Sequence, residues 1–232
     1  MVTILLALVA LQEDPEVDAA IAKFRATMNR TKSPVEQATA IHDLAKTPHE
    51  KTLAVLTPFV TSGPGHLRAA AIRAVSGFDD KKVLPLLIKS LGANAGEPRA
   101  VEMALECLGR LGDEAALPHL QRHLADKDDF VARSAVKAVG ALRHASSIDP
   151  LIELLKAQEK ALANAGSGGV GPVIPSATKG SIRPDASIRK NAEALSALIQ
   201  ESLGKITGQA FKTSADWRTW WTANRATFKV GP

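Results

Sequence analysis

The sequence predicts an all-α fold, an α-solenoid in which pairs of short helices stack and a capping helix closes each end. Three observations lead to this prediction. Apolar side chains recur at helical spacing, a pattern of about 32 residues recurs along the chain, and capping residues mark the helix starts. The clearest copy of the pattern spans residues 99–126, so it defines what the other copies should contain.

The copy at residues 99–126 has the sequence of two helices joined by a tight turn. Gly112 suits the left-handed backbone position that ends a helix, and Asp113 can accept the free N–H groups at the start of the next one. Pro118 falls in the first turn of that second helix, where a missing N–H costs least. Gly109 lets a neighbouring backbone approach closely. The buried stripe of the first helix consists of Ala104, Leu105, Leu108 and Leu111.

Glycine and proline positions show that the pattern recurs. Gly109 lies 32 residues after Gly77 and 31 residues before Gly140, which predicts equivalent positions for the three. A late copy surrounds Gly204, which lies 64 residues, or two periods, beyond Gly140. The second helices carry a proline at the same spacing, at Pro85, Pro118 and Pro150. Because one helix pair cannot bury its own apolar side, only a stack of such pairs is stable.

Residues 2–11 form a continuously apolar run that is too short to span a bilayer, which needs about 20 residues. Its length fits the apolar region of a secretory signal peptide, so we expect residues 1–12 to be a signal peptide and the protein to be periplasmic or secreted. The mature chain is then expected to have no stable membrane span. The positively charged start of such peptides is missing, and the alternative is a first buried helix in a cytoplasmic protein.

The next segments begin with clear helix-start signals. A capping acid followed by proline at residues 14–15 starts a helix that caps the N-terminal end of the stack over residues 13–32. Four repeats are expected to fill residues 33–163. Capping boxes at residues 33–36 and 47–50 bracket the two helices of the first repeat.

Residues 164–187 are rich in Gly, Ser and Pro and lack an apolar period, which predicts a flexible insertion. A final repeat helix and a Trp-rich cap then occupy residues 188–232. All three tryptophans, Trp217, Trp220 and Trp221, lie in this cap and are expected to seal the last repeat. Trp220 and Trp221 point about 100° apart on a helix, so both cannot be buried, and Trp220 is the candidate contact residue. Stacking of sugars or bases is the alternative role.

The segments AL, LGRLGD, ALP and L between Ala104 and Leu120 resemble the short HEAT repeats of bacterial proteins, including bilin-lyase-like HEAT proteins. The resemblance covers residues 34–159 and 188–208. It implies a right-handed α-α superhelix, a HEAT-like solenoid, whose second helices line a concave surface. HEAT repeats serve scaffolds, nucleic-acid binders and a few enzymes, so the fold alone does not name an activity. The ending Ile-Thr-Gly-Gln followed by the three tryptophans resembles the C-terminal cap of exported bacterial HEAT proteins.

Residues capable of catalysis or metal binding are few and scattered. His119 and His123 stand four apart on one helix and could share a metal, but no third ligand accompanies them, so we expect no metal and no cofactor. Cys107 aligns with Ala74 and Ala138, which indicates a small buried filler and not a reactive thiol. The sequence contains neither a nucleophile elbow nor a paired-carboxylate motif, so an enzyme is not expected.

Basic side chains mark the candidate binding surface. Lys89, Arg122 and Lys156 fall at nearly the same place in three consecutive second helices, which the HEAT resemblance places on the concave surface. A basic ladder there suits an acidic partner segment or a nucleic-acid backbone, and the plainer alternative is a solvated helix face. The net charge of +5 permits such partners without requiring them. We predict a non-enzymatic scaffold that binds an unidentified protein on its concave face through Lys89, Arg122, Lys156 and Trp220.

Two alternative functions stay open from the sequence. One is a nucleic-acid module that resembles HEAT-like alkylpurine DNA glycosylases, whose basic groove carries Trp and a catalytic carboxylate. The tryptophans here lie at the terminus and not along a groove, which departs from that pattern. The other is a lyase of the bilin-attaching type, which rests on the resemblance of the repeats alone.

Overall fold

A computed structural model describes residues 14–166 and 184–231. The described residues form α-helices and short 3₁₀ turns, with no β-strand among them, as the sequence predicts. None of the helices in these two ranges is long and apolar enough to cross a bilayer. The predicted signal peptide and most of the predicted insertion lie outside the described residues.

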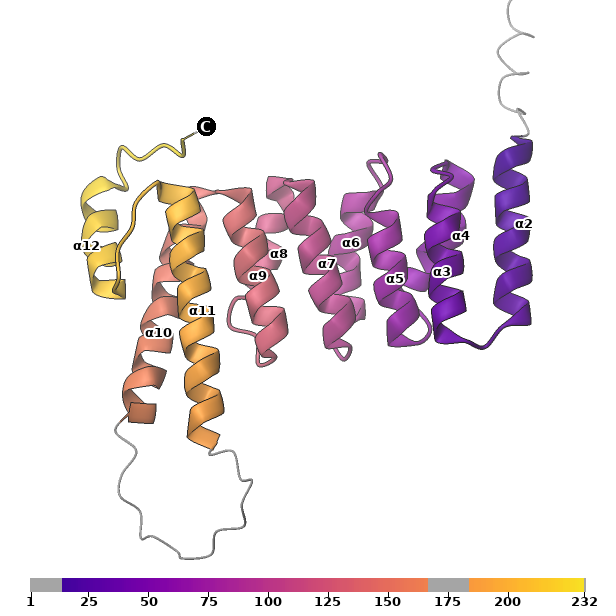
Figure 1. Cartoon of the computed structure of the whole chain (residues 1–232). Coiled ribbons are helices and arrows are strands. Elements are labelled where there is room, and N and C mark those ends of the chain that lie inside the picture. The colour runs from indigo at the N-terminus through magenta and orange to yellow at the C-terminus, as the bar shows by residue number, and fades with distance from the viewer. Residues whose placement is uncertain (1–13, 167–183, 232) are drawn as a thin grey trace, which may run out of the picture. The chain divides into compact units, whose positions relative to one another are not determined.

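The chain divides into two compact units, an N-terminal unit up to Cys107 and a C-terminal unit from Leu108 onward. In the N-terminal unit, first helices and second helices form two layers (Figure 1). Its helices are α2 (Pro15–Arg30), α3 (Pro34–Ala45), α4 (Glu50–Thr61), α5 (Gly65–Val75), α6 (Val83–Ala93) and the first part of α7 (Pro98–Leu111). Its core is mainly apolar, with fully buried side chains at Ile41, Leu56, Ile72, Val75 and Leu87.

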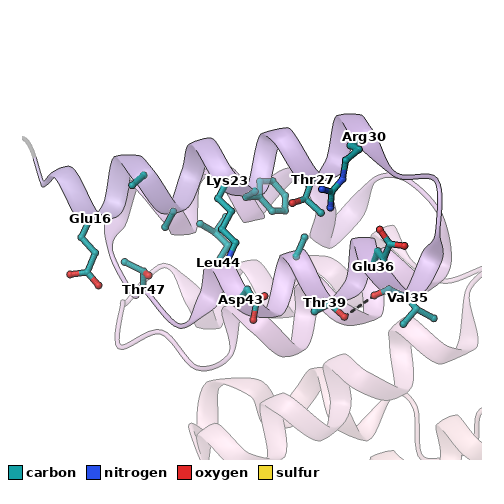
Figure 2. A pocket seen from close by; sticks show the side chains of 14 residues that line it. Glu16, Lys23, Thr27, Arg30, Val35, Glu36, Thr39, Asp43, Leu44 and Thr47 are labelled. Atoms are coloured by element: carbon teal, nitrogen blue, oxygen red, sulfur yellow. Dashed lines mark hydrogen bonds between the residues drawn. The ribbon is translucent and has the colours of Figure 1, made fainter.

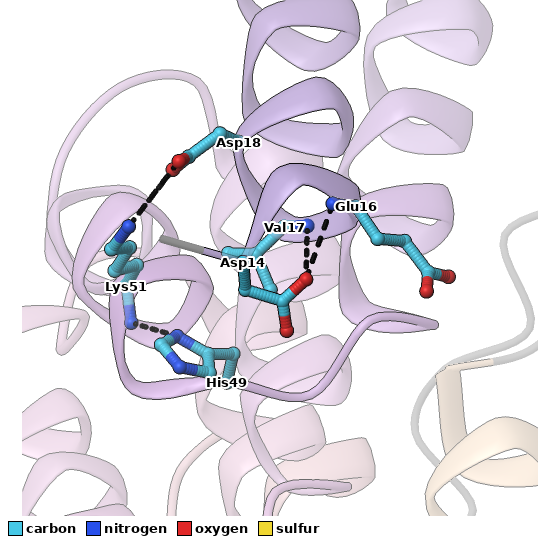
Figure 3. Close-up of polar contacts among 6 residues, drawn as sticks. All are labelled: Asp14, Glu16, Val17, Asp18, His49 and Lys51. Atoms are coloured by element: carbon cyan, nitrogen blue, oxygen red, sulfur yellow. Dashed lines mark hydrogen bonds and ion pairs between the residues drawn. The ribbon is translucent and has the colours of Figure 1, made fainter. Parts of the chain in front are cut away.

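Side-chain caps fix where the first helices of this unit begin. Asp14 accepts hydrogen bonds from the backbone N–H groups of Glu16 and Val17 at the start of α2, as predicted. The second expected capping box is displaced by two residues. His49, and not Thr47, caps α4, because its Nδ1 accepts a hydrogen bond from the backbone N–H of Lys51 (Figure 3). The backbone N–H of His49 donates to the hydroxyl of Thr52.

A buried asparagine links three helices of the N-terminal unit. Asn94 ends α6 and is fully buried. Its amide donates to the carbonyl oxygens of Val60 at 3.0 Å and Ser90 at 2.8 Å, and its carbonyl oxygen accepts from Arg68 at 2.9 Å. Arg68 also pairs with Glu97. Because buried amides are costly unless they are satisfied, this network specifies how α4, α5 and α6 meet.

The C-terminal unit continues the helix pairs and ends in the helix that carries the three tryptophans. Gly112 has a φ of 69°, and Asp113 caps the 3₁₀ turn Glu114–Ala116 by accepting from Ala115 N, as its sequence position suggests. The α-helices after α7 are α8 (Leu117–Gln121), α9 (Asp129–Leu142), α10 (Ile148–Gly166), α11 (Pro184–Thr207) and α12 (Ser214–Asn224). α10 continues to Gly166 and α11 begins at Pro184, so helix covers both ends of the segment expected to be an insertion.

The glycines that define the repeat are not all equivalent. A β-carbon on Gly109 would lie 2.8 Å from Cα of Ala138 in α9, and one on Gly140 would lie 2.8 Å from Cβ of Ser202 in α11. Both glycines therefore permit a close helix approach within the C-terminal unit. Gly77 differs, because it follows the end of α5, is exposed, and has no such neighbour. The expectation of three equivalent positions is wrong for Gly77.

Candidate interaction surfaces

The second helices of the N-terminal unit form a groove of about 440 Å³ between α4 and α6. Its apolar lining includes Leu53, Pro58 and Leu86. An ion pair between Glu50 and Lys82 crosses from one helix to the other. The hydrogen bond between them lowers the pKa of the Glu50 carboxyl and raises that of the Lys82 ammonium. The groove is thus apolar at its centre and internally neutralised at one end.

The predicted basic residues are all exposed. Lys89 lies on α6 in the N-terminal unit. It comes seven residues after Lys82 and three residues after Leu86, so the three side chains share one face of the helix. Arg122 ends α8 and Lys156 lies in α10, both in the C-terminal unit. Lys89, Arg122 and Lys156 form no salt bridge with any residue that the structure describes. Their alignment as one ladder remains a prediction.

A second groove of about 580 Å³ lies between α2 and α3, with Phe24 and Leu44 among its lining residues (Figure 2). α2 packs against α3 and, less extensively, against α4. Charged side chains of both signs surround the opening. They come from both helices and include Glu16, Lys23, Arg30, Glu36 and Asp43 (Figure 2). This mixed rim favours no single class of partner.

The tryptophan-bearing helix α12 packs against α10. Trp217 is fully buried and packs edge-on against Phe211, with ring centres 4.9 Å apart. Trp221 is also buried, and its Nε1 donates to Asp149 in α10 at 2.9 Å. Trp220, the predicted contact residue, is half-buried between these rings and Phe228. The predicted contact residue therefore makes its ring contacts within the C-terminal segment, and a role in partner binding remains a prediction.

Polar contacts complete the attachment of α12 to α10. The Arg218 guanidinium pairs with both Asp149 and Glu153 of α10. Glu159, one turn and a half further along α10, accepts from the backbone N–H of Ser214 at 2.8 Å and from its hydroxyl. The sequence of α12 indicates an apolar role for its tryptophans. No local signal in the sequence of α10 indicates that its acidic side chains contact α12.

The candidate chemical residues lie in structural roles. His119 and His123 are half-buried, and Nδ1 of His123 lies 3.1 Å from Oδ2 of Asp126. Within residues 14–166 and 184–231 no group of three His, Cys, Asp or Glu side chains could hold a metal ion. Cys107 is fully buried, with its sulfur 3.9 Å from the carbonyl oxygen of Ile72.

The comparison with known families agrees with this architecture. The family model for HEAT repeats matches residues 21–105 and 92–166, which together span more than half of the chain. The chain belongs to the HEAT-repeat family. No curated protein matches the sequence. HEAT-repeat membership establishes a helical repeat protein of a kind that commonly mediates protein interactions, and it names neither the partner nor the surface that binds it.

The sequence reasoning missed all of the grooves. Buried stripes and single basic residues describe one helix at a time, whereas each groove is lined by side chains from two or three helices. One signal was present: α3 and α5 are rich in alanine on their outer faces, and small side chains there leave a depression that larger residues would fill.

Proposed function

We propose that this HEAT-repeat protein is a non-enzymatic scaffold that binds a partner protein along its second helices. The groove between α4 and α6 carries the proposal. It is open, its centre is apolar, and Lys89 extends the same face of α6 without a carboxylate partner. An apolar centre beside a charged, accessible rim is the usual composition of a protein interface.

The C-terminal unit offers the same kind of side chain on its own second helices. Arg122 and Lys156 are exposed and unpaired among the described residues, as Lys89 is. Each unit therefore offers exposed basic side chains of its own to the acidic groups of a partner. Rim charges of this kind act mainly on association rate and specificity, so their removal should matter most at moderate salt.

The test is a pull-down from the envelope fraction with two charge-matched variants. Lys89→Glu, Arg122→Glu and Lys156→Glu are combined in one protein. Arg25→Glu, Lys190→Glu and Arg225→Glu, at exposed positions outside the groove, are combined in the control. A partner recovered with the wild type and the control, but lost with the first variant, supports the proposal. Equal recovery with all three proteins contradicts it.

Binding to nucleic acid is the competing outcome. A mobility-shift experiment with duplex DNA would show an affinity that falls steeply with salt if the basic residues contact phosphates. Specific DNA binding by the wild type, lost in the Lys89, Arg122 and Lys156 variant, would replace the scaffold proposal with a nucleic-acid module.

We also propose that the protein is exported, on the support of the apolar run at residues 2–11. N-terminal sequencing of the protein purified from its own cells tests this. A mature chain that starts near residue 13 supports export, and an intact Met1 contradicts it.

A further inference from the structure

The first helices of the N-terminal unit form the layer opposite α4 and α6 (Figure 1). A further groove lies along these first helices. Side chains of α3, α5 and α7 line about 830 Å³. Its floor is built almost entirely from small residues, namely Ala38, Ala45, Ala69, Ala70 and Ala74. Because the distance between packed helices depends on the side chains at the contact, alanines allow another helix to approach closely.

Apolar side chains at the edge of the groove are available to a partner. Val35, at the start of α3, is 74% exposed, the most exposed large apolar side chain among the described residues. Met103 of α7 lines the groove and is half-buried. A flexible thioether adapts to varied partner surfaces, so Met103 and Val35 can supply apolar contacts beside the alanine floor.

The charge of the groove is of one sign. Its lining contains no Asp or Glu, and it includes five basic residues, His42, Lys46, His66, Arg73 and Arg99. All five are exposed. Lys46 pairs with Asp43 at 2.7 Å, but Arg73, Arg99 and His66 form no salt bridge with any described residue.

Arg73 is held in place by its neighbour across the groove. Its Nε donates to the sulfur of Met103 at 3.3 Å, which links α5 to α7 and positions the guanidinium beside the alanine floor. The planar guanidinium is suited to bidentate binding of a carboxylate. Arg99, at the start of α7, provides a second guanidinium on the same side.

We propose that this groove binds an acidic amphipathic helix of a partner protein. Glutamate and aspartate on one side of that helix meet Arg73, Arg99 and the other basic side chains, and its small apolar side lies on the alanine floor. A nucleic-acid backbone is disfavoured, because phosphates and sugars gain nothing from the alanine floor or from Val35. The inference goes beyond the proposed function, because a chain with docking surfaces on both layers could hold two partners at once.

A synthetic helix serves as the probe. We use a fluorescein-labelled peptide of about 20 residues, about 30 Å long as a helix, with Glu at i, i+4 spacing on one side and Ala and Leu on the other. A peptide with Lys in place of every Glu is the control probe. Fluorescence anisotropy should show saturable binding of the acidic peptide to the full chain and none of the basic peptide. No saturable binding of the acidic peptide would overturn the proposal.

Paired variants locate the site. Arg73→Glu with Arg99→Glu should weaken the acidic peptide at least about tenfold, which corresponds to about 1.4 kcal/mol. Arg25→Glu with Arg225→Glu makes the same charge change outside the groove and should leave binding within about twofold of the wild type, since distant exposed charges are screened. Similar losses in both pairs, or none in the first pair, would overturn the proposal.

A variant of the floor separates a helix from a nucleic acid. Ala70→Gln keeps the charge and the helix propensity of α5 but fills part of the groove. It should weaken the peptide several-fold and leave any binding of duplex DNA unchanged. If DNA binds more tightly than the peptide and Ala70→Gln affects neither, the groove is a phosphate-binding surface and the proposal is wrong.

The same measurements separate this inference from the proposed function. Lys89→Glu lies on the other layer of helices and should not change peptide binding. Conversely, Arg73→Glu with Arg99→Glu should not reduce recovery of a partner that depends on Lys89. Either proposal can therefore be contradicted without contradicting the other.

Discussion

At the residue scale, small and buried polar positions decide how the helices meet. Gly109 and Gly140 were identified from their spacing alone, and the structure explains them by the approach of α9 and α11. Asn94 carried no such signal, because its three partners come from segments up to 34 residues away. The spacing of residues in the chain therefore predicts which positions of one helix face its neighbours. It does not predict which polar groups of other helices will contact those positions.

Gly109→Ala should destabilise the protein by about 1–3 kcal/mol, because the new β-carbon meets the backbone of Ala138, which cannot move aside cheaply. Gly92→Ala in α6 is the matched control, since a β-carbon there meets nothing within 4 Å. It should be neutral or stabilise by up to about 1 kcal/mol through helix propensity. Urea titrations of both variants measure the difference. A Gly109→Ala protein as stable as the control would contradict the close approach.

Asp126 should make a small, pH-dependent contribution to stability. Burial would raise the pKa of its carboxyl, but hydrogen bonds from the backbone N–H of Asp128 and from His123 lower it below the ordinary value of 3.8. A carboxyl with a lowered pKa in the folded state stabilises the fold above its unfolded pKa, and the stabilisation disappears as the pH falls through the folded pKa. Asp126→Asn should therefore be less stable than the wild type near neutral pH. Unfolding followed from neutral to strongly acidic pH should show the difference shrinking below about pH 4. A constant difference across that range would exclude the linkage.

At the element scale, helix starts were largely predictable and short helices were not. Asp14 and Ser33 cap α2 and α3 where the sequence places them. The residue that caps α4 is His49 and not the predicted Thr47. The imidazole nitrogen of His49 accepts from the backbone N–H of Lys51, and the hydroxyl of Thr52 accepts from the backbone N–H of His49. α8 is only one turn long and follows a 3₁₀ turn, although its apolar stripe reads as a longer helix.

The final helix provides the sharpest test at this scale. Trp217→Ala removes a fully buried indole and should cost about 3–5 kcal/mol. Trp220→Ala removes a half-buried ring from the same helix and should cost clearly less. Thermal unfolding followed by far-UV circular dichroism compares the two. Equal effects would mean that α12 does not seal the end of the stack through Trp217.

At the scale of the whole molecule, the period of about 32 residues is sufficient to predict an α-solenoid from the sequence alone. It could not predict the grooves, which depend on side chains brought together from successive repeats. The basic groove of the N-terminal unit also lies on a different layer from the predicted basic residues. Those residues are on second helices, whereas the basic side chains that line this groove are on the first helices α3, α5 and α7.

Stability in such a repeat protein should be local. Leu56→Ala removes a fully buried side chain from α4 and should cost the N-terminal unit about 2–5 kcal/mol. Repeats interact chiefly with their neighbours, so amides of α10 and α11 should keep most of their protection. Hydrogen exchange measured by mass spectrometry distinguishes the regions. A uniform loss of protection along the chain would show a single cooperative fold instead.

The placement of the tryptophans has a practical consequence. The chain has three tryptophans and no tyrosine, and all three tryptophans belong to α12. Tryptophan emission from this protein therefore comes from its last helix alone. A shift in emission wavelength without a change in far-UV circular dichroism would indicate that α12 has detached. The tryptophans therefore act as an intrinsic fluorescence probe of local unfolding at this end of the chain.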